Sequence, residues 1–210
     1  MSTWTSRVLL AVAGMSLAAC TGSIDVGRAA PEVIAVAGRS VAVGGPPGYC
    51  VDRAASRDGV KAFVLLGSCA SIARDPDGDK PESPGIMTVV VSSDPATVQA
   101  VAGRRSDLMD FFRSEAGRAS LSRVGRAETV RVSNLQTAGG ALYIRARDSS
   151  AGPLPGMSDD YWRALLDVNG RLVTISVIGF EDQPMSSEEG FRLIRAAADR
   201  VMSESARLSG

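Results

Sequence analysis

The chain has 210 residues, of which 45% are hydrophobic, 22% charged and 5% aromatic, which is enough apolar material for one ordinary core. Lysine plus arginine and aspartate plus glutamate number 23 each, so the formal net charge is zero and we expect no nucleic-acid partner. The sequence contains no histidine, which excludes the enzyme classes that use the commonest general base or the commonest zinc ligand. We predict neither a cofactor nor a metal ion.

The N-terminus has the anatomy of a signal peptide. A single cation, Arg7, precedes the apolar stretch Val8–Ala19, and Cys20 follows directly. The apolar stretch is shorter than the roughly 20 residues that a membrane-spanning helix needs. We therefore expect residues 1–19 to be removed as a signal peptide.

The end of that stretch, Leu17-Ala18-Ala19-Cys20, resembles a bacterial lipobox. The resemblance implies cleavage before Cys20 and lipidation of its thiol, so that acyl chains such as palmitate hold the protein at a membrane. The alternative is ordinary secretion with cleavage after an A-x-A-like site. Thr21 stands where an aspartate favours inner-membrane retention in enterobacterial lipoproteins, so by similarity the outer membrane is favoured, with the domain in the periplasm.

Two further cysteines, Cys50 and Cys69, follow the predicted cleavage site. An even pair in an oxidising compartment predicts a disulfide, which would close a loop of about 20 residues and stabilise the fold by roughly 3 kcal/mol. The alternative, a redox or metal pair, lacks the C-x-x-C spacing. Residues 20–31 are small and polar, as expected of a lipidated tether, and residues 32–210 are predicted to form a single domain.

Strands dominate the predicted first half of this domain. Val33–Ala37 and Val41–Val43 flank a short turn and predict a hairpin. Phe63–Gly67 is continuously apolar, which predicts a central strand buried on both faces. The other expected elements here are a strand at Tyr49–Val51, an exposed loop at residues 74–85 and a strand at Ile86–Val91.

A long central helix is predicted next. Asp94 and Pro95 are typical of the N-cap and first position of a helix. One apolar stripe follows, formed by Val98, Val101, Leu108 and Phe112. We expect the helix to end near Gly117 and a shorter helical or irregular piece to continue to Arg126.

Two hairpins come after this helix, and the second is the better specified. Asn169-Gly170 suits the positive φ angles of a type I′ turn. This turn predicts a core face with the pairs Trp162–Val177, Ala164–Ile175 and Leu166–Val173, and a mixed face with Asp167–Leu172, Leu165–Thr174 and Arg163–Ser176. The first hairpin turns near Gly139-Gly140, with Leu135, Leu142 and Ile144 on its apolar side and Asn134, Tyr143 and Arg145 on the other.

The C-terminal helix is predicted to begin with a capping box from Ser186 to Glu189 and to bury Phe191, Ile194, Ala198 and Val201. The element order predicts an α+β domain, an antiparallel β-sheet packed by a long central helix and a C-terminal helix. The stretch Arg171–Val177 and the helix Ser186–Met202 resemble the layout of the photosystem extrinsic subunit PsbP and its relatives, which implies a similar second half but carries over no functional residue. The segments GYCVD and FVLLGSC are similar to segments of small alphaproteobacterial envelope proteins of unknown function.

Arginines supply the main candidate binding residues. Seven arginines (104, 105, 113, 118, 123, 126 and 131) face four acids (Asp107, Asp110, Glu115 and Glu128) in one segment. Guanidinium groups suit phosphates and carboxylates, so Arg104 and Arg105 are candidate anion-binding residues, although an ordinary solvated helix face is the alternative. We also expect one face of the sheet to bear Tyr143, Arg145 and Arg163 and to be able to bind a small ligand or lipid.

Other chemical signals are weak. Asp75, Asp77 and Asp79 crowd three carboxylates into one loop, but the spacing does not match an EF-hand, so a solvated loop is favoured over a calcium site. The sequence has neither a G-x-S-x-G nor an S-x-x-K nucleophile pattern.

Together these features favour a membrane-anchored envelope lipoprotein that acts as a noncatalytic accessory or protein-interaction domain. Its expected partners are the membrane, through the N-terminal lipid, and another envelope protein. Two alternatives remain open. One is a small-ligand or lipid-binding periplasmic module, and the other is an envelope enzyme whose acid–base chemistry rests on Asp, Glu or Tyr alone.

Overall fold

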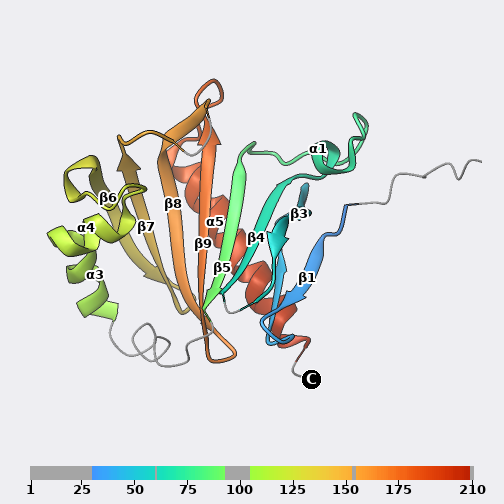
Figure 1. Ribbon diagram of the computed structural model, residues 1–210, viewed down its shortest axis with the longest axis horizontal. Helices are drawn as coiled ribbons and strands as arrows, with labels where there is room; N and C mark the ends of the chain where they lie inside the picture. The colour runs from blue at the N-terminus through green and yellow to red at the C-terminus, as the bar shows by residue number, and fades with distance from the viewer. Residues whose placement is uncertain (1–29, 60, 93–104, 153–154, 209–210) are drawn as a thin grey trace, which may run out of the picture.

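The computed structural model describes residues 30–59, 61–92, 105–152 and 155–208 (Figure 1). Its main part is a seven-stranded antiparallel sheet with the strand order β3-β4-β5-β9-β8-β7-β6, and β1 pairs with β2 in a separate hairpin. The strands are β1 (Val33–Val36), β2 (Val41–Gly44), β3 (Tyr49–Arg57), β4 (Lys61–Ser68), β5 (Ile86–Ser92), β6 (Val130–Ala138), β7 (Ala141–Asp148), β8 (Met157–Val168) and β9 (Arg171–Phe180). The helices are α1 (Cys69–Ala73), α3 (Arg105–Arg113), α4 (Glu115–Leu121) and α5 (Ser187–Ala206), with a 3₁₀ turn η2 (Ala127–Thr129). The chain thus combines a large antiparallel sheet with helices, an α+β arrangement.

Both faces of the sheet carry a hydrophobic core. Helix α5 and the β1–β2 hairpin cover one face, where Ile194, Ala198 and Val201 pack against the sheet. Helices α3 and α4 cover the other face over β6 and β7, where Phe112 and Leu121 are buried. Figure 1 shows α5 crossing one face of the sheet and α3 and α4 beside β6.

The β8–β9 hairpin confirms the predicted turn and register. Asn169 and Gly170 have φ angles of 51° and 71°, as a type I′ turn requires. All six predicted cross-strand pairs are present. The predicted core face is buried, whereas the other face mixes half-buried residues with the exposed Asp167 and the buried Ser176.

The pairing of β7 with β8 decides which side chains share a face. Tyr143 lies opposite Ala164, whereas Ile144 lies opposite Arg163. Because side chains alternate along a strand, Tyr143 and Arg145 point to the α5 face and Arg163 points to the α3–α4 face. The prediction that one face bears Tyr143, Arg145 and Arg163 is therefore wrong. The apolar side of the β6–β7 hairpin lies on the same face of the sheet as the mixed side of the β8–β9 hairpin, which carries Arg163, and not on the same face as its core side.

Strand β4 also differs from the prediction. It lies second from one edge of the sheet, and its residues alternate between buried and half-buried instead of being buried on both faces. The reason is the uneven cover of the sheet. Of the described helices, α3 and α4 pack over β6 at the far edge, so within the described part of the chain the second face of β4 receives less cover than the face that carries α5 and the β1–β2 hairpin.

The predicted central helix is interrupted. Its first part, from Asp94 to residue 104, lies outside the described residues, and α3 ends at Arg113 rather than near Gly117. Ser114 then caps α4 by accepting a hydrogen bond from the N–H of Gly117 at 3.2 Å. A Cβ at position 117 would lie 1.9 Å from the carbonyl oxygen of Phe111, so the close turn between the two helices requires glycine there.

A disulfide and a side-chain hydrogen bond join elements of the N-terminal part of the chain to their neighbours in the fold. The sulfur atoms of Cys50 and Cys69 lie 2.10 Å apart, as a disulfide between β3 and α1. At the end of α5, the buried hydroxyl of Ser205 accepts from Ala42 N–H at 2.9 Å, which ties the helix to β2. The capping box at the start of α5 has both predicted bonds between Ser186 and Glu189.

Among the residues described here, no helix has the length and apolar composition needed to cross a membrane.

Helix α5 approaches the sheet most closely at Gly190. A Cβ there would lie 2.5 Å from the Trp162 ring, which also packs against Phe191 with ring centroids 5.3 Å apart. We expect Gly190→Ala to lower the free energy of unfolding by about 1–3 kcal/mol despite the better helix propensity of alanine, because the helix must move off the sheet. Urea denaturation measures this change. The exposed substitution Asp199→Ala is the control, and a Gly190→Ala protein as stable as the parent would contradict the packing described here.

Candidate functional site

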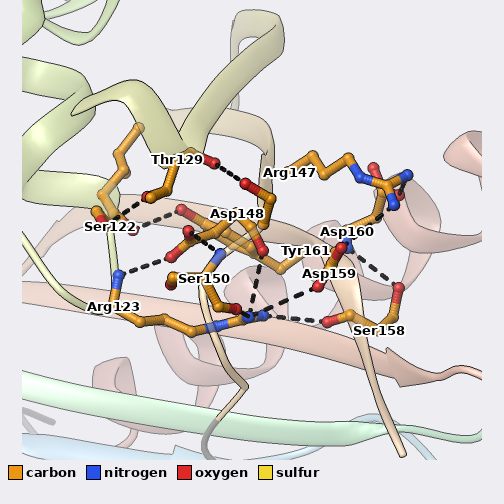
Figure 2. Close-up of polar contacts among 12 residues, drawn as sticks. Ser122, Arg123, Thr129, Arg147, Asp148, Ser150, Ser158, Asp159, Asp160 and Tyr161 are labelled. Carbon is orange, nitrogen blue, oxygen red and sulfur yellow. Dashed lines mark hydrogen bonds and ion pairs between the residues drawn. The ribbon is translucent and has the colours of Figure 1, made fainter. Parts of the chain in front are cut away.

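A buried polar cluster stands where β7 ends and β8 begins (Figure 2). At its centre is Asp148, whose side chain is 0% exposed. One carboxylate oxygen accepts from the backbone N–H of Arg123 at 2.7 Å, and the other accepts from the N–H of Ser150 at 3.0 Å. The carboxylate thereby joins the loop after α4 to the end of β7.

Hydrogen bonds keep this buried carboxylate ionised. Burial by itself raises the pKa of Asp148, but the hydrogen bonds from the backbone N–H groups of Arg123 and Ser150 favour the ionised carboxylate and hold the pKa below its ordinary value. Asp148 is therefore a structural anion at neutral pH rather than a proton donor.

Arg123 serves the same cluster. Its guanidinium donates to the carbonyl oxygens of Asp148 at 3.3 Å, Ser150 at 3.2 Å and Ser158 at 3.1 Å. The side chain is 16% exposed, and the nearest carboxylate oxygen, on Asp159, is 4.0 Å away. Arg123 belongs to the arginine-rich segment that suggested anion binding in the sequence analysis. Its guanidinium instead binds backbone carbonyls and fixes the segment between β7 and β8.

An arginine groove of about 660 Å³ lies against this cluster. Four guanidinium groups line it from four different elements: Arg113 ends α3, Arg118 lies in α4, Arg131 in β6 and Arg147 in β7. Glu128 is the one carboxylate among the described residues that line it, and it pairs with Arg126 at 3.6 Å. The remaining lining residues are Thr129, Val130, Val132 and Ser149.

A β-bulge places two of these arginines side by side. From Asn134 to Ala138, the partners on β7 follow directly from the Gly139-Gly140 turn, but beyond the bulge the register shifts by one residue. Arg131 consequently lies opposite Arg147, and Asp148 lies opposite Val130. Without the extra residue Ser133, Arg131 would have faced Asp148, an opposite-charge pair. Like charges directly across a ladder are unfavourable, so this arrangement concentrates positive charge at a cost in stability.

Neighbouring groups hold these arginines without using all their donors. Arg147 reaches Asp159 at 3.2 Å and Asp160 at 3.4 Å, and Arg113 pairs with Asp110 at 3.0 Å. Arg118 donates to the carbonyl of Arg113 at 2.6 Å. Arg131 has no ion-pair partner in the part of the chain that the structure describes. Each guanidinium carries five N–H donors, so the groove retains donors for a phosphate or carboxylate.

The residues predicted as a ligand-binding face are dispersed. Tyr143 is 1% exposed and packs edge-on against Phe191 under α5, so it is a core residue, and burial raises the pKa of its hydroxyl. Arg145 is partly exposed and lies 3.8 Å from Asp160. Arg163, on the opposite face, donates to the Ser176 hydroxyl at 3.1 Å and stacks on the Tyr161 ring, and burial lowers its pKa.

The predicted arginine pair 104–105 contributes no described side chain. Arg104 lies outside the described residues, and Arg105 is the first residue of α3. Arg147 was not among the predicted residues because it follows the arginine-rich segment in sequence. The hairpin pattern offered a signal, since the Gly139-Gly140 turn brings the end of β7 back beside Arg131.

A second, larger cleft of about 750 Å³ separates α5 from the GGPPG turn and the loop around Lys80. Its charges are of both signs, since carboxylates line it together with Lys80, Arg192 and Arg200, and Arg200 lies 3.9 Å from Glu32. Of these two cavities, the arginine groove has the more one-sided charge.

No metal site is found in the loop that carries Asp75, Asp77 and Asp79, or elsewhere among the described residues, because no three Cys, Asp or Glu side chains gather there as a metal ion would require.

Comparisons with known proteins add no family. No protein-family model matches the chain, and neither a curated protein nor a solved structure matches it significantly.

The Asp148 cluster predicts an acid-sensitive contribution to stability. We expect Asp148→Asn to lower the free energy of unfolding by about 2–3 kcal/mol at pH 7, because an amide N–H₂ then faces the donor groups of Arg123 and Ser150. Since the folded pKa lies below the unfolded value of about 3.9, the contribution is present above about pH 4 and is lost as the pH falls through the folded pKa. Urea denaturation between pH 7 and pH 3 should show the two proteins converging. Asp110→Asn, at an exposed ion pair, is the control, and a pH-independent difference for Asp148→Asn would contradict the assignment.

Proposed function

We propose that this chain is a noncatalytic binding domain of the bacterial cell envelope, tethered to a membrane by lipid, which holds an acidic partner protein in the arginine groove. The observation that carries the proposal is the convergence of Arg113, Arg118, Arg131 and Arg147 on one concavity of a protein with zero formal net charge. Guanidinium groups bind carboxylates with two parallel hydrogen bonds, which gives both affinity and direction.

The chemistry around the groove supports binding rather than catalysis. The hydroxyl of Thr129 donates to the carbonyl of Arg126 at 2.9 Å, and that of Ser149 donates to the carbonyl of Thr129 at 3.3 Å. Neither hydroxyl proton is directed at a base, which a nucleophile would need. Asp148, the nearest buried carboxylate, is held ionised by donors and is unsuited to proton transfer near neutral pH.

The lipid anchor is the second part of the proposal, and it is supported by the resemblance of Leu17-Ala18-Ala19-Cys20 to a lipobox. Several acyl chains at Cys20 would hold the domain at the bilayer surface, because each buried methylene adds about 0.8 kcal/mol of membrane affinity. Thr21 in place of aspartate favours the outer membrane over the inner one. The domain would then face the periplasm, where a disulfide between Cys50 and Cys69 persists.

Substitution of Cys20 tests the anchor. In a bacterial host with a lipoprotein pathway, the full-length protein should incorporate labelled palmitate and sediment with membranes, and Cys20→Ala should abolish both. Cys69→Ala serves as the matched control, because it removes a cysteine without touching the lipobox. Labelling that persists in Cys20→Ala would contradict the lipoprotein assignment.

Charge removal tests the groove. A fluorescein-labelled glutamate-rich peptide should bind the purified domain with an affinity that falls as salt rises. We expect the double variant Arg131→Gln/Arg147→Gln to weaken binding at least about tenfold, equivalent to about 1.4 kcal/mol, by fluorescence anisotropy. The matched control Arg195→Gln/Arg207→Gln removes the same charge from α5 and its C-cap residue. Equal losses in both double variants would indicate nonspecific attraction and refute the groove as the binding site.

A further inference from the structure

The arginine groove runs along a free edge of the sheet. Strand β6 is the last strand in the order, and within the described ranges no strand flanks its outer side (Figure 1). Ser149 N–H donates to the Thr129 carbonyl at 2.9 Å, which makes residues 129 and 149 a hydrogen-bonded pair. Such pairs alternate along an antiparallel ladder, so Arg131 bonds to β7, whereas Val130 and Val132 direct their backbone groups outward.

The outward backbone groups form a short row of unused positions. The N–H of Val130 turns back to the carbonyl of Ala127, in agreement with its outward direction. Three outward backbone groups have no backbone partner among the described residues: the carbonyl of Val130 and the N–H and carbonyl of Val132. Both residues line the arginine groove.

The arginines flank this row on both faces of the sheet. Arg131 and Arg147 share the face that carries Tyr143, as the pairings of β6 with β7 and of β7 with β8 require. Arg113 and Arg118 belong to α3 and α4, which pack on the opposite face. A chain laid along β6 would thus meet positive charge on each side of its backbone.

We infer that an acidic segment of the partner protein adds to the edge of β6 as an extended strand. Its backbone bonds to Val130 and Val132, and its carboxylates, which alternate between the two faces, reach Arg131 and Arg147 on one side and Arg113 and Arg118 on the other. This inference rests on the proposed function, whose groove it occupies.

The position of the tether favours a protein partner over the lipids of the anchoring membrane. The first described residues meet β3, where Val51 N–H donates to the Pro31 carbonyl at 2.7 Å, and β3 and β6 are the two opposite edges of the sheet. Six strand spacings separate these edges, a distance of about 28 Å. The groove therefore lies at the far side of the sheet from the point where the tether enters.

Charged side chains and bulges at a sheet edge can also serve to prevent pairing with another strand, and an edge with that role alone would bind no peptide.

The test uses a glutamate-rich peptide whose acids alternate with valine and threonine, and fluorescence anisotropy measures its binding to the intact domain. Two further versions carry N-methyl groups on alternate backbone nitrogens, one version on the odd positions and one on the even positions. A single set should face β6, so one methylated peptide should bind at least about tenfold more weakly while the other binds like the parent.

A protein variant provides the complementary measurement. Val132→Pro removes the outward N–H while leaving the ladder to β7 intact, and it should weaken the peptide in the same way, with Val132→Ala as the control for the side chain. The N-methyl series keeps the test valid if Val132→Pro does not fold.

The outcomes separate strand addition from the proposed function. If both methylated peptides bind like the parent and Arg131→Gln/Arg147→Gln still weakens them, strand addition is overturned and the groove keeps its acidic partner. If the peptide fails to bind and phosphatidylglycerol vesicles bind through the same arginines, a lipid replaces the protein partner, so the inference is wrong and the proposed function loses its protein partner but keeps its anion-binding groove. If neither probe binds, the proposed function itself fails.

Discussion

The extra residue at Ser133 sets the relation between β6 and β7 on which the candidate site depends. It places Arg131 opposite Arg147 at the surface, and Val130 opposite Asp148, which is buried. The buried carboxylate needs donors, and it accepts hydrogen bonds from the N–H groups of Arg123 and Ser150. Those bonds fix the loop after α4 and the segment between β7 and β8, next to the two arginines that the bulge brings together.

The two-sided core explains why so few polar side chains of the sheet are available for function. Helix α5 packs on one face and α3 with α4 on the other, so that Tyr143 and Ile144, neighbours in sequence, are buried in different cores. An arginine on such a sheet either lies within a core, as Arg163 does beside Tyr161 and Ser176, or lies near an edge. The arginines with spare donors, Arg131 and Arg147, stand at the β6 edge and at a strand end, on the face of the sheet opposite the α3–α4 core and beyond the residues of the α5 core.

Sequence reasoning succeeded where local chemistry decides the structure. The Asn169-Gly170 turn defines the register of its hairpin as far as the pair Tyr161–Ile178, because a two-residue type I′ loop leaves a single register, and the capping box defines the start of α5. The two faces of the β6–β7 hairpin were also predicted correctly, because Leu135, Leu142 and Ile144 share one core. The bulge in β6 and the pairing of β7 with β8 were not predicted, since a bulge has no strong local signal and since the pairing of two hairpins depends on the tertiary structure. The break at Ser114 likewise depends on the close approach of Gly117 to Phe111, which a hydrophobic stripe does not reveal. The candidate site was foreseen as an arginine-rich segment, and its completion by Arg147 required the fold.

The electrostatics of the groove argue for a ligand that arrives already extended and acidic. Arg131 and Arg147 face each other across the ladder. Asp159 and Asp160 compensate the charge of Arg147, whereas no described carboxylate pairs with Arg131. Exposed ion pairs of this kind contribute little stability, about 0–1 kcal/mol, so they orient Arg147 without withdrawing it from a competing carboxylate. A globular surface reaches such an edge at few points, whereas a strand presents backbone donors and acceptors and alternate side chains together, in the spacing that β6 itself has. In the proposed complex, the carboxylates of the partner would relieve the remaining repulsion between the two arginines, and charge, rather than buried apolar area, would then be the source of specificity.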